Sequence, residues 1–420
     1  MREDPAYLGF EPLPPLEAIV QALVHDPPER RWYLVRALCR LADPRERAEL
    51  IQALQPYVDQ VEDFRVRYRL LLALKVLHHP FRVNNYVLVA GRGVLRPEEL
   101  TEPPAAVAEA VAAELGRVID VHIHPKSPDL KFFADLREAG ISHAVILATD
   151  TDPTDVERPE IRAQLEADYS RAALARRLPF PRMLRQIQAS LYSPTHVTNQ
   201  DVADWVRDYP ERLIGFGSVN LSKSRDYVLA KIDEVHRLGL RGFKLLPYSQ
   251  FFNPAENDRV PLLFEYCRQE GAVVLSHTGC GAGPFELLEL SGNNHPNLWE
   301  PIVQRYPEVP LILAHFGAYS SQVPGIWLYE ALQLGKKYKN VYADLAAVDW
   351  LLDREIVVKE IRKTIGFDRV LFASDYPMPL AAGISLTSVV KHLQANKFMT
   401  PKEKCKVLWR NAARLFRLEE

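Results

Sequence analysis

The sequence predicts an α/β protein built on a (β/α)8 TIM-type barrel with an N-terminal helical extension. Three observations support this prediction. Eight short runs have the composition of buried strands, helical patterns separate them, and polar side chains gather where several of the runs end. At 420 residues the chain is also long enough for a barrel of about 250 residues with additions.

The predicted strands begin with the segment from Arg117 to Pro125, in which polar and apolar side chains alternate. Most of the other runs are almost continuously apolar, as expected for strands of a parallel sheet that is covered on both faces. In chain order they are Ala144–Ala148, Leu213–Val219, Gly242–Leu246, Ala272–His277, Leu311–His315, Val341–Leu345 and Val370–Asp375.

Apolar residues at helical spacing lie in the intervals between most of these strands. Gly140 and Gly239 directly follow two of these patterns, at the position where glycine commonly ends a helix. The predicted helices are Phe132–Ala139, Val228–Leu238, Leu262–Glu270, Pro301–Tyr306, Trp327–Leu334 and Leu351–Ile365.

Two connections are longer than the barrel requires. The first is a helical insertion at about 150–208, with patterns at Ile161–Ala175 and Met183–Leu191, and it suits a lid on the active-site rim or a dimer contact. The second, Gly279–Asn297, is rich in glycine but lacks the lysine and hydroxyl residue of a phosphate-binding loop. We interpret it as a loop that approaches its neighbours closely.

The first 115 residues form a separate predicted region, and residues 116–420 form the predicted barrel domain. Helical periodicity at Glu46–Val58 and Arg65–Leu77 suggests a small bundle of paired helices. We interpret residues 1–115 as a helical extension or cap, because too few repeats are visible for a HEAT-like solenoid. His78 and His79 fit the end of a helix better than a ligand pair, since no carboxylate or thiol closely follows them.

Composition bounds the possible partners. The formal charge is −2, with 52 basic and 54 acidic residues, so no overall field favours nucleic acid or an anionic membrane. None of the 4 cysteines has a neighbour at redox-motif or metal-site spacing, and the first residues lack the apolar core of a signal peptide. We expect a soluble, cytoplasmic protein with a small-molecule substrate, and a homo-oligomer is an open alternative.

The first strand carries the strongest chemical signal. Strict alternation places Val118, Asp120, His122 and His124 on one face and Ile119, Val121 and Ile123 on the other. Two imidazoles therefore leave the same face, and neutral imidazole is the commonest protein ligand for zinc-like ions. Asp120 lies one step behind the two histidines and is expected to support them from the barrel interior.

Further ligand-type residues fall at or near the ends of later strands, and in a barrel these ends share one mouth. Together with His122 and His124 they are Lys244, His277, His315 and Asp375. A divalent ion held by His122, His124, His277 and Asp375 would lower the pKa of water from about 15.7 toward 7. Asp375 could accept the proton, and His315 could polarise a carbonyl or bind a second ion.

These motifs resemble the amidohydrolase superfamily, and in particular its amidohydrolase-2 branch of metal-dependent hydrolases, lactonases, decarboxylases and hydratases. The resemblance covers about Val118 to Phe416. The matching segments are Asp120–His124, Arg241–Pro247, Leu275–Gly279, Ala314–Gly317 and Phe372–Pro377.

The resemblance implies roles for individual residues. His122, His124 and His277 correspond to metal ligands, His315 to a ligand or catalytic histidine, and Asp375 to a ligand and proton carrier. Lys244 corresponds to a lysine that is carbamylated in two-metal members and unmodified in many one-metal members. The chain departs from the family at Leu246, where the fourth-strand motif commonly has histidine.

Other polar residues beside the predicted strand ends are candidates for substrate binding, because their hydrogen-bonding types suit a carboxylate or a phenol. They are Lys126, Tyr248, Gln250, His295 and Tyr376.

The leading hypothesis is hydrolysis of an amide, ester or lactone bond by metal-activated water, with His315 stabilising the oxyanion and Asp375 carrying the proton. The alternatives are nonoxidative decarboxylation of an aromatic or unsaturated acid, and a noncatalytic barrel used for binding or assembly. The ligand set suits zinc, manganese and iron alike; we expect zinc first, with manganese or iron as alternatives, and one ion is favoured over two.

Overall fold

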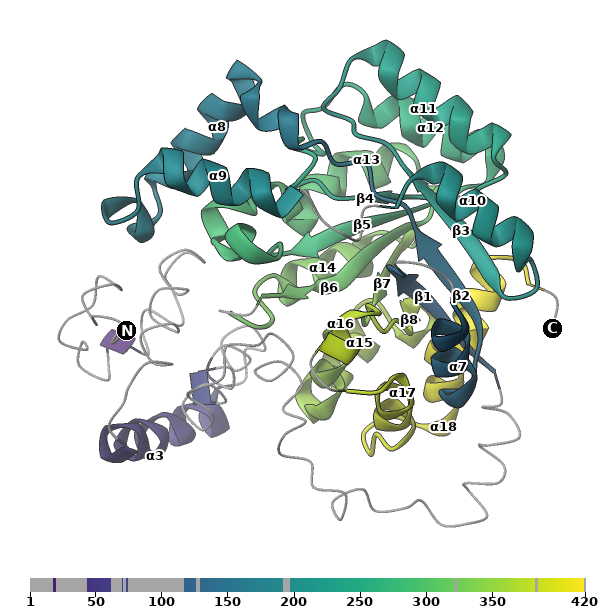
Figure 1. Ribbon diagram of the computed structural model, residues 1–420. Coiled ribbons are helices and arrows are strands. Elements are labelled where there is room, and N and C mark those ends of the chain that lie inside the picture. The colour runs from purple at the N-terminus through teal and green to yellow at the C-terminus, as the bar shows by residue number, and fades with distance from the viewer. Residues whose placement is uncertain are drawn as a thin grey trace.

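A computed structural model provides the structure of the protein. It describes residues 18–19, 44–61, 70, 73–74, 117–125, 129–191, 197–320, 323–381 and 384–418. Within these ranges a parallel sheet lies at the centre of the molecule and helices surround it (Figure 1).

The described part of the chain contains one eight-stranded parallel sheet whose strands pair in sequence order, as predicted. Backbone hydrogen bonds from Val121 N to Phe372 O (3.1 Å) and from His124 N to Tyr376 O (2.8 Å) join the first strand to the chain around the eighth, so the barrel nearly closes. The strands are β1 Val118–Ile123, β2 Ile141–Leu147, β3 Leu213–Ser218, β4 Gly242–Leu245, β5 Val273–Gly279, β6 Leu311–Tyr319, β7 Val341–Asp344 and β8 Val370–Leu371.

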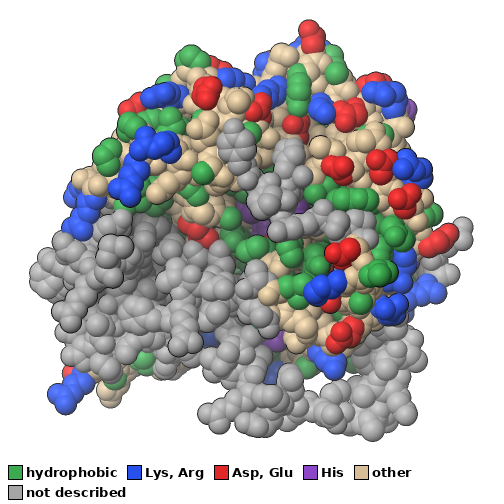
Figure 2. Space-filling model, in the orientation of Figure 1, with side chains coloured by type: hydrophobic (Ala, Val, Ile, Leu, Met, Phe, Trp, Pro, Cys, Tyr) green, Lys and Arg blue, Asp and Glu red, His purple; other side chains and the backbone are tan. Residues whose placement is uncertain are grey.

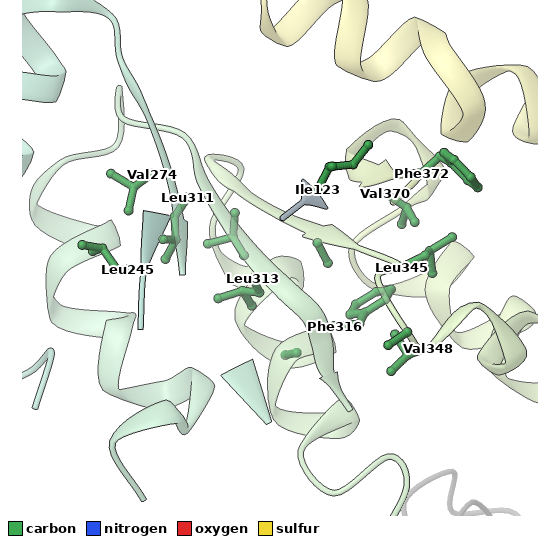
Figure 3. Close-up of a cluster of buried hydrophobic side chains, with 14 of the residues drawn as sticks. Ile123, Leu245, Val274, Leu311, Leu313, Phe316, Leu345, Val348, Val370 and Phe372 are labelled. Carbon is green, nitrogen blue, oxygen red and sulfur yellow. The ribbon is translucent and has the colours of Figure 1, made fainter. Parts of the chain in front are cut away.

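Apolar side chains form an inner and an outer core. The inner core fills the barrel with residues such as Val145, Ile214 and Leu275. The outer core lies between the strands and the surrounding helices, and Figure 3 shows part of it, including Leu245 and Val274. Buried faces on both sides explain why the strands after β1 lack a polar alternation.

The face assignment predicted for β1 is wrong beyond Val121. Ile119 and Val121 belong to the inner core, but Ile123 belongs to the outer core (Figure 3). The cause is a register shift against β2 between Asp120 and Ile123, since an extra residue in a strand reverses the alternation that follows it. This shift allows Val121 to fill the barrel while the next residue, His122, lines a cavity at its mouth.

Helices occupy the predicted intervals between strands, with ends that differ by a few residues. They are α7 Leu130–Glu138, α11 Arg225–Arg237, α12 Val260–Glu270, α13 Glu300–Arg305, α14 Leu328–Lys337 and α15 Glu355–Lys363, and the short helix η9 Asp349–Asp353 precedes the last. Side-chain caps begin α7 at Asp129 and α11 at Ser224, which satisfies backbone N–H groups that the helix leaves without partners.

Helices after β8 were not predicted, and they complete the barrel. The last of them packs Ala412, Ala413 and Phe416 against the inner core, and the Phe416 ring lies 5.8 Å from that of Phe216. The chain therefore closes one end of the barrel with its own C-terminal segment. These elements are α16 Met378–Ala381, α17 Leu386–Gln394, α18 Pro401–Cys405, the π-helical turn η11 Lys406–Arg410 and α19 Asn411–Leu415, and the short turn η10 Phe367–Arg369 lies directly before β8.

The connection between β2 and β3 contains the predicted helical insertion. In Figure 1 its two longer helices project to one side of the barrel. The elements are η3 Pro153–Glu157, α8 Pro159–Ser170, η4 Ala173–Arg176 and α9 Phe180–Leu191, followed by α10 Asn199–Asp208. The last part of the predicted range, α10, packs against β3 as an ordinary crossover helix, so the insertion proper ends with α9.

A separate apolar cluster joins the insertion to the loops after β5 and β6. It includes Ile187 and Leu191 of α9, Phe285 of the β5 loop and Trp327. The β5 loop consists of short 3-10 turns, η5 Gly283–Glu286, η6 Leu288–Leu290, η7 Gly292–Asn294 and η8 Pro296–Trp299.

The close approach predicted for the β5 loop is present. A Cβ atom on Gly279, whose φ is 95°, would lie 2.6 Å from the Tyr319 carbonyl oxygen. A Cβ atom on Gly281 would lie 2.6 Å from the Tyr248 ring. Both positions therefore require glycine for the backbone to pass its neighbours.

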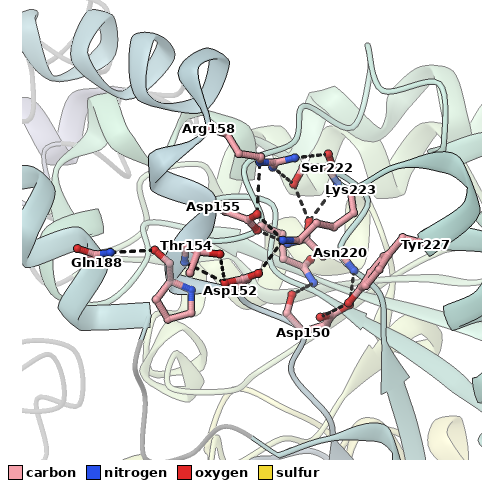
Figure 4. Close-up of polar contacts among 12 residues, drawn as sticks. Asp150, Asp152, Thr154, Asp155, Arg158, Gln188, Asn220, Ser222, Lys223 and Tyr227 are labelled. Atoms are coloured by element: carbon pink, nitrogen blue, oxygen red, sulfur yellow. Dashed lines mark hydrogen bonds and ion pairs between the residues drawn. The ribbon is translucent and has the colours of Figure 1, made fainter.

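A buried polar network anchors the start of the insertion to the chain after β3 (Figure 4). The Asp155 carboxylate, 1% exposed, forms ion pairs with Lys223 and Arg158 and accepts a hydrogen bond from Asn220 Nδ2 at 2.8 Å. Asp150 accepts from the Asn220 backbone N–H at 2.7 Å. These contacts fix the position at which the insertion leaves the barrel.

Replacing Asp155 with alanine should lower the free energy of unfolding by about 2 kcal/mol, because the change leaves the Asn220 amide without its buried acceptor and leaves Lys223 only its pair with Asp152. Urea unfolding followed by circular dichroism measures this loss. The matched control is Asp233→Ala, which removes an exposed pair with Arg237 and should cost under about 1 kcal/mol. Equal costs for the two variants would contradict the anchoring role.

In the N-terminal region, helix α3 Pro44–Gln60 covers the predicted helix at Glu46–Val58. Most of residues 1–115, including His78, His79 and all of the second predicted helix except residues 70 and 73–74, lie outside the described ranges. The division into a cap at 1–115 and a barrel at 116–420 remains a prediction. Among the described helices, none has the length and apolar character needed to cross a membrane.

Candidate active site

A cavity of about 510 Å³ lies at the carboxyl ends of the strands. Histidine side chains are visible near the centre of the face in Figure 2, between outer surfaces that carry charges of both signs. Of the residues predicted from the sequence, those that line the cavity are His122, His124, Tyr248, His277, His315, Asp375 and Tyr376.

His122 lies at the centre of one group of possible ligands. Its Nε2 is 3.2 Å from His124 Nε2 and 3.6 Å from Asp375 Oδ1, and these three atoms all lie within 4.8 Å of one another. Asp375 reaches this position because its backbone N–H donates to the His122 carbonyl at 3.1 Å. The contact between β1 and the chain after β8 therefore assembles three of the four predicted ligands.

His277 and His315 extend the group along neighbouring strands β5 and β6. His277 Nδ1 is 3.1 Å from His315 Nε2, and the ring centroids of His315 and His122 are 4.9 Å apart. Four imidazoles thus form one continuous cluster. His277 joins it through His315, whereas the close group of three contains His122, His124 and Asp375.

Hydrogen bonds fix the orientation of three of these rings. His122 Nδ1 lies 2.9 Å from Asp344 Oδ2, His277 Nε2 lies 2.9 Å from the Cys280 carbonyl, and His315 Nδ1 lies 2.9 Å from the Ala346 carbonyl. Because these acceptors require an N–H donor, the opposite nitrogen of each ring carries the lone pair. The lone pairs of His277 Nδ1 and His315 Nε2 therefore face each other at 3.1 Å.

This arrangement fits a bound cation. Inward lone pairs repel one another unless a positive charge lies among them, and the donor set of imidazole nitrogens with one carboxylate suits zinc and related ions. Burial lowers the pKa of His122, His124 and His315 well below the usual value and that of His277 to about 3. The imidazoles are therefore neutral at pH 7, which is the form that binds metal.

Two ionisable groups lie beside the imidazoles. Burial raises the pKa of Asp375 to about 8, opposed by the nearby Lys244 cation. Burial lowers the pKa of Lys244 to about 8, opposed by Asp344 and Asp375. Lys244 Nζ is 2.9 Å from His122 Nε2, and its side chain is fully buried outside the cavity lining.

The backbone is strained at two site residues. His315 and Asp375 have φ values of 58° and 60°, in the left-handed region that costs side-chain-bearing residues about 1–3 kcal/mol each. At His315 this conformation accompanies a hydrogen bond from its backbone N–H to Asp344 Oδ1 at 2.7 Å. The fold therefore holds the two side chains in place at some cost to stability.

Two of the residues predicted to contact substrate do not line the cavity. Gln250 is fully buried, and its amide bonds the backbone of Leu246, Val219 and Asp150, so it holds loops together. His295 accepts a hydrogen bond from Asn297 N at 3.2 Å and does not line the cavity. Lys126 lies outside the described residues.

The sequence interpretation missed Asp344. This fully buried carboxylate contacts His122 Nδ1 through Oδ2, and its Oδ1 accepts from the backbone N–H groups of His315 and Ala346. Its signal was available, since Asp344 is the polar residue next to the end of the seventh apolar run, and in the structure it ends β7. Asp120, expected to support the histidines, accepts from the backbone N–H groups of His122 and Ser374, both at 3.1 Å.

Several solved structures are similar to this chain at low sequence identity. An uncharacterized TIM-barrel protein from Bordetella bronchiseptica is 18% identical, with a TM-score of 0.51 over 72% of this chain and 98% of that one. A 5-carboxyvanillate decarboxylase from Sphingomonas paucimobilis is 15% identical, with a TM-score of 0.46 over 72% and 99%. A probable 2-pyrone-4,6-dicarboxylic acid hydrolase from Acinetobacter baumannii is 13% identical, with a TM-score of 0.45 over 72% and 99%.

The first of these structures supports the barrel fold but no particular activity. No curated protein matches the chain by sequence. The family model described as Amidohydrolase, Amidohydro_2, matches residues 119–418, which include every strand of the barrel except the first residue of β1. The chain therefore belongs to the amidohydrolase family, as its strand-end motifs suggested.

Proposed function

We propose that the protein is a metal-dependent hydrolase that cleaves an amide, ester or lactone bond of a small molecule. The observation that carries this proposal is the convergence of His122, His124 and Asp375 at one end of a cavity, with His277 and His315 beside them. Membership of the amidohydrolase family supports an enzyme. A noncatalytic barrel would not require this set of oriented, neutral imidazoles.

His122, His124, His277 and Asp375 would hold one divalent ion, for which zinc is our first choice and manganese or iron are alternatives. Asp344 also lies within 4.8 Å of His122 and His315 donor atoms. Both of its oxygens already accept hydrogen bonds, so it is better suited to orient ligands than to bind a second ion. Because the corresponding lysine is carbamylated in members that bind two ions, a single ion favours an unmodified Lys244, whose Nζ lies 2.9 Å from His122 Nε2.

A bound ion would supply Lewis acidity and a source of hydroxide at neutral pH. Asp375, itself one of the proposed ligands, can also take a proton from the attacking water and return it to the leaving group. His315 donates its Nδ1–H to the Ala346 carbonyl, so its Nε2 carries a lone pair. That nitrogen can accept a proton, but it has no hydrogen with which to stabilise an oxyanion. This assignment differs from the oxyanion-stabilising role expected from the sequence.

Decarboxylation of an aromatic acid is the second candidate. It is favoured by the aromatic rings of Tyr248 and Tyr319, whose centroids lie 4.9 Å from His277 and 5.0 Å from His315 respectively. Such rings can hold a planar acid beside a group that delivers a proton to carbon. Cys267 and Cys280 are buried thiols outside any disulfide, which fits the cytoplasmic location that we propose.

Removing and restoring metal tests the proposal. Protein treated with a chelator should lose turnover of an ester, lactone and amide panel, and recover it with about one equivalent of zinc or manganese per chain. His124→Ala should abolish that recovery, whereas His236→Ala, which removes a half-exposed histidine outside the cavity, should not. Carbon dioxide release from carboxylic acids without bond hydrolysis would select the decarboxylase instead.

A further inference from the structure

An unbroken run of aromatic contacts leads away from the proposed ligands along one wall of the cavity. The Tyr319 ring lies 5.0 Å from His315 and 5.9 Å from His277. Tyr248 lies 4.9 Å from His277 on one side and 4.9 Å from Phe285 on the other. This wall presents ring faces and edges to any molecule that reaches the ligands.

Aliphatic side chains continue the lining. Leu246 follows β4, and Leu191 ends helix α9 of the insertion. Leu191 belongs to the same apolar cluster as Phe285, so the insertion packs against the β5 loop through buried apolar side chains. The polar network at Asp155 fixes the root of the insertion to the barrel.

Few ionisable side chains line the described part of the cavity. Within the described ranges no lysine or arginine lines the cavity, and its ionisable acid is Asp375. The remaining polar groups include the hydroxyls of Thr149, Thr151 and Ser190. Lys244, the nearest buried cation, lies against His122 Nε2 and below the lining. A carboxylate placed against Leu246 or Phe285 would lose part of its hydration, and the described lining offers it no cationic side chain in exchange.

The Tyr248 phenol is uncharged at neutral pH, because a phenol ionises only at about pH 10. The wall is therefore apolar or neutral from the imidazoles to Phe285. Uncharged aromatic groups are the ligands that such a surface accommodates with the least loss of solvation.

We propose that the substrate carries an uncharged, planar aromatic group next to the bond that is cleaved, and that Leu246 and Leu191 make the cavity select against anionic substituents on that group. This inference rests on the proposed hydrolytic function. It narrows that function to neutral aryl esters, aryl lactones and anilides. Leu246 and Leu191 act as specificity-determining residues and take no part in bond cleavage.

The test compares matched probes on metal-loaded, full-length protein. The neutral probes are dihydrocoumarin and phenyl acetate, and the anionic probes are the same molecules with one carboxylate on the ring. Wild-type protein should favour the neutral member of each pair by about 100-fold in kcat/KM, with the difference mainly in KM.

Three variants separate charge from shape. Leu246→Arg should raise the anionic-to-neutral ratio of kcat/KM by at least about 10-fold, because it gives the carboxylate a partner. Leu246→Gln, of similar size but uncharged, should change the ratio by less than about 3-fold. Leu229→Arg, on the exposed face of α11, should leave both rates unchanged. Leu191→Arg repeats the test from the insertion if Leu246→Arg fails to fold.

The outcomes are distinct. Faster cleavage of the neutral probes, together with the predicted shift in Leu246→Arg or Leu191→Arg, supports the inference. Equal or faster cleavage of the carboxylated probes by wild-type protein overturns the inference and leaves hydrolysis standing. Cleavage of none of the four probes by metal-loaded protein overturns the aryl substrate class, and inactivity on the wider ester, lactone and amide panel overturns the proposed function itself.

Discussion

Asp375→Asn should lower kcat by about 1,000-fold or more while the protein stays folded, because an amide cannot accept and return a proton at this position. The carboxylate is 3.6 Å from His122 Nε2 and belongs to the group of proposed ligands. Loss of a ligand and loss of a proton carrier therefore act together. Asparagine also tolerates the left-handed backbone that Asp375 adopts, with φ of 60°, so the substitution preserves local geometry.

Steady-state kinetics on the best ester, lactone or amide substrate measure this loss, and circular dichroism checks the fold. The matched control is Asp258→Asn, which changes an 80% exposed aspartate and should leave kcat within about 2-fold of wild type. Normal turnover in metal-loaded Asp375→Asn would eliminate the proposed role of this residue.

Asp344→Asn should weaken metal binding by about 10-fold to 100-fold, although Asp344 is not among the proposed ligands. Its carboxylate fixes His122 as an Nδ1–H donor over 2.9 Å and accepts the His315 backbone N–H over 2.7 Å. An amide can satisfy these donors only through its single oxygen, so His122 would lose the partner that keeps its Nε2 lone pair directed inward. Turnover should fall with metal affinity and recover in part at high metal concentration.

Competition with a metal-sensitive chelator measures the change in affinity. Asp368→Asn serves as the control, since that side chain is 58% exposed and pairs with Lys406 on the surface. Unchanged affinity in Asp344→Asn would show that the His122 contact does not control the metal site.

Much of the barrel could be predicted because its determinants are local. Each strand after β1 is an apolar run buried on both faces, and each polar residue that ends such a run marks the mouth of the barrel. His277, His315 and Asp375 were found by this rule. Asp344 obeys the same rule and was missed because its neighbour Leu345 was counted as part of the run.

Other features depend on contacts between distant parts of the chain. The register shift in β1 arises from pairing with β2, so alternation within β1 could not reveal that Ile123 faces the outer core. Gln250 has the composition of a ligand-binding residue, but its amide is used by Leu246, Val219 and Asp150. The cavity wall at Leu191 depends on how the insertion folds back, which no local pattern specifies.

Anomalous X-ray diffraction from crystals of the metal-loaded protein tests the central claim most directly. We predict one peak in the cavity, about 2.0–2.3 Å from His122 Nε2, His124 Nε2 and Asp375, with His277 completing the coordination. The Asp344 carboxylate should carry no peak. A cavity without any anomalous signal after exposure to zinc, manganese and iron would contradict the metal-dependent function.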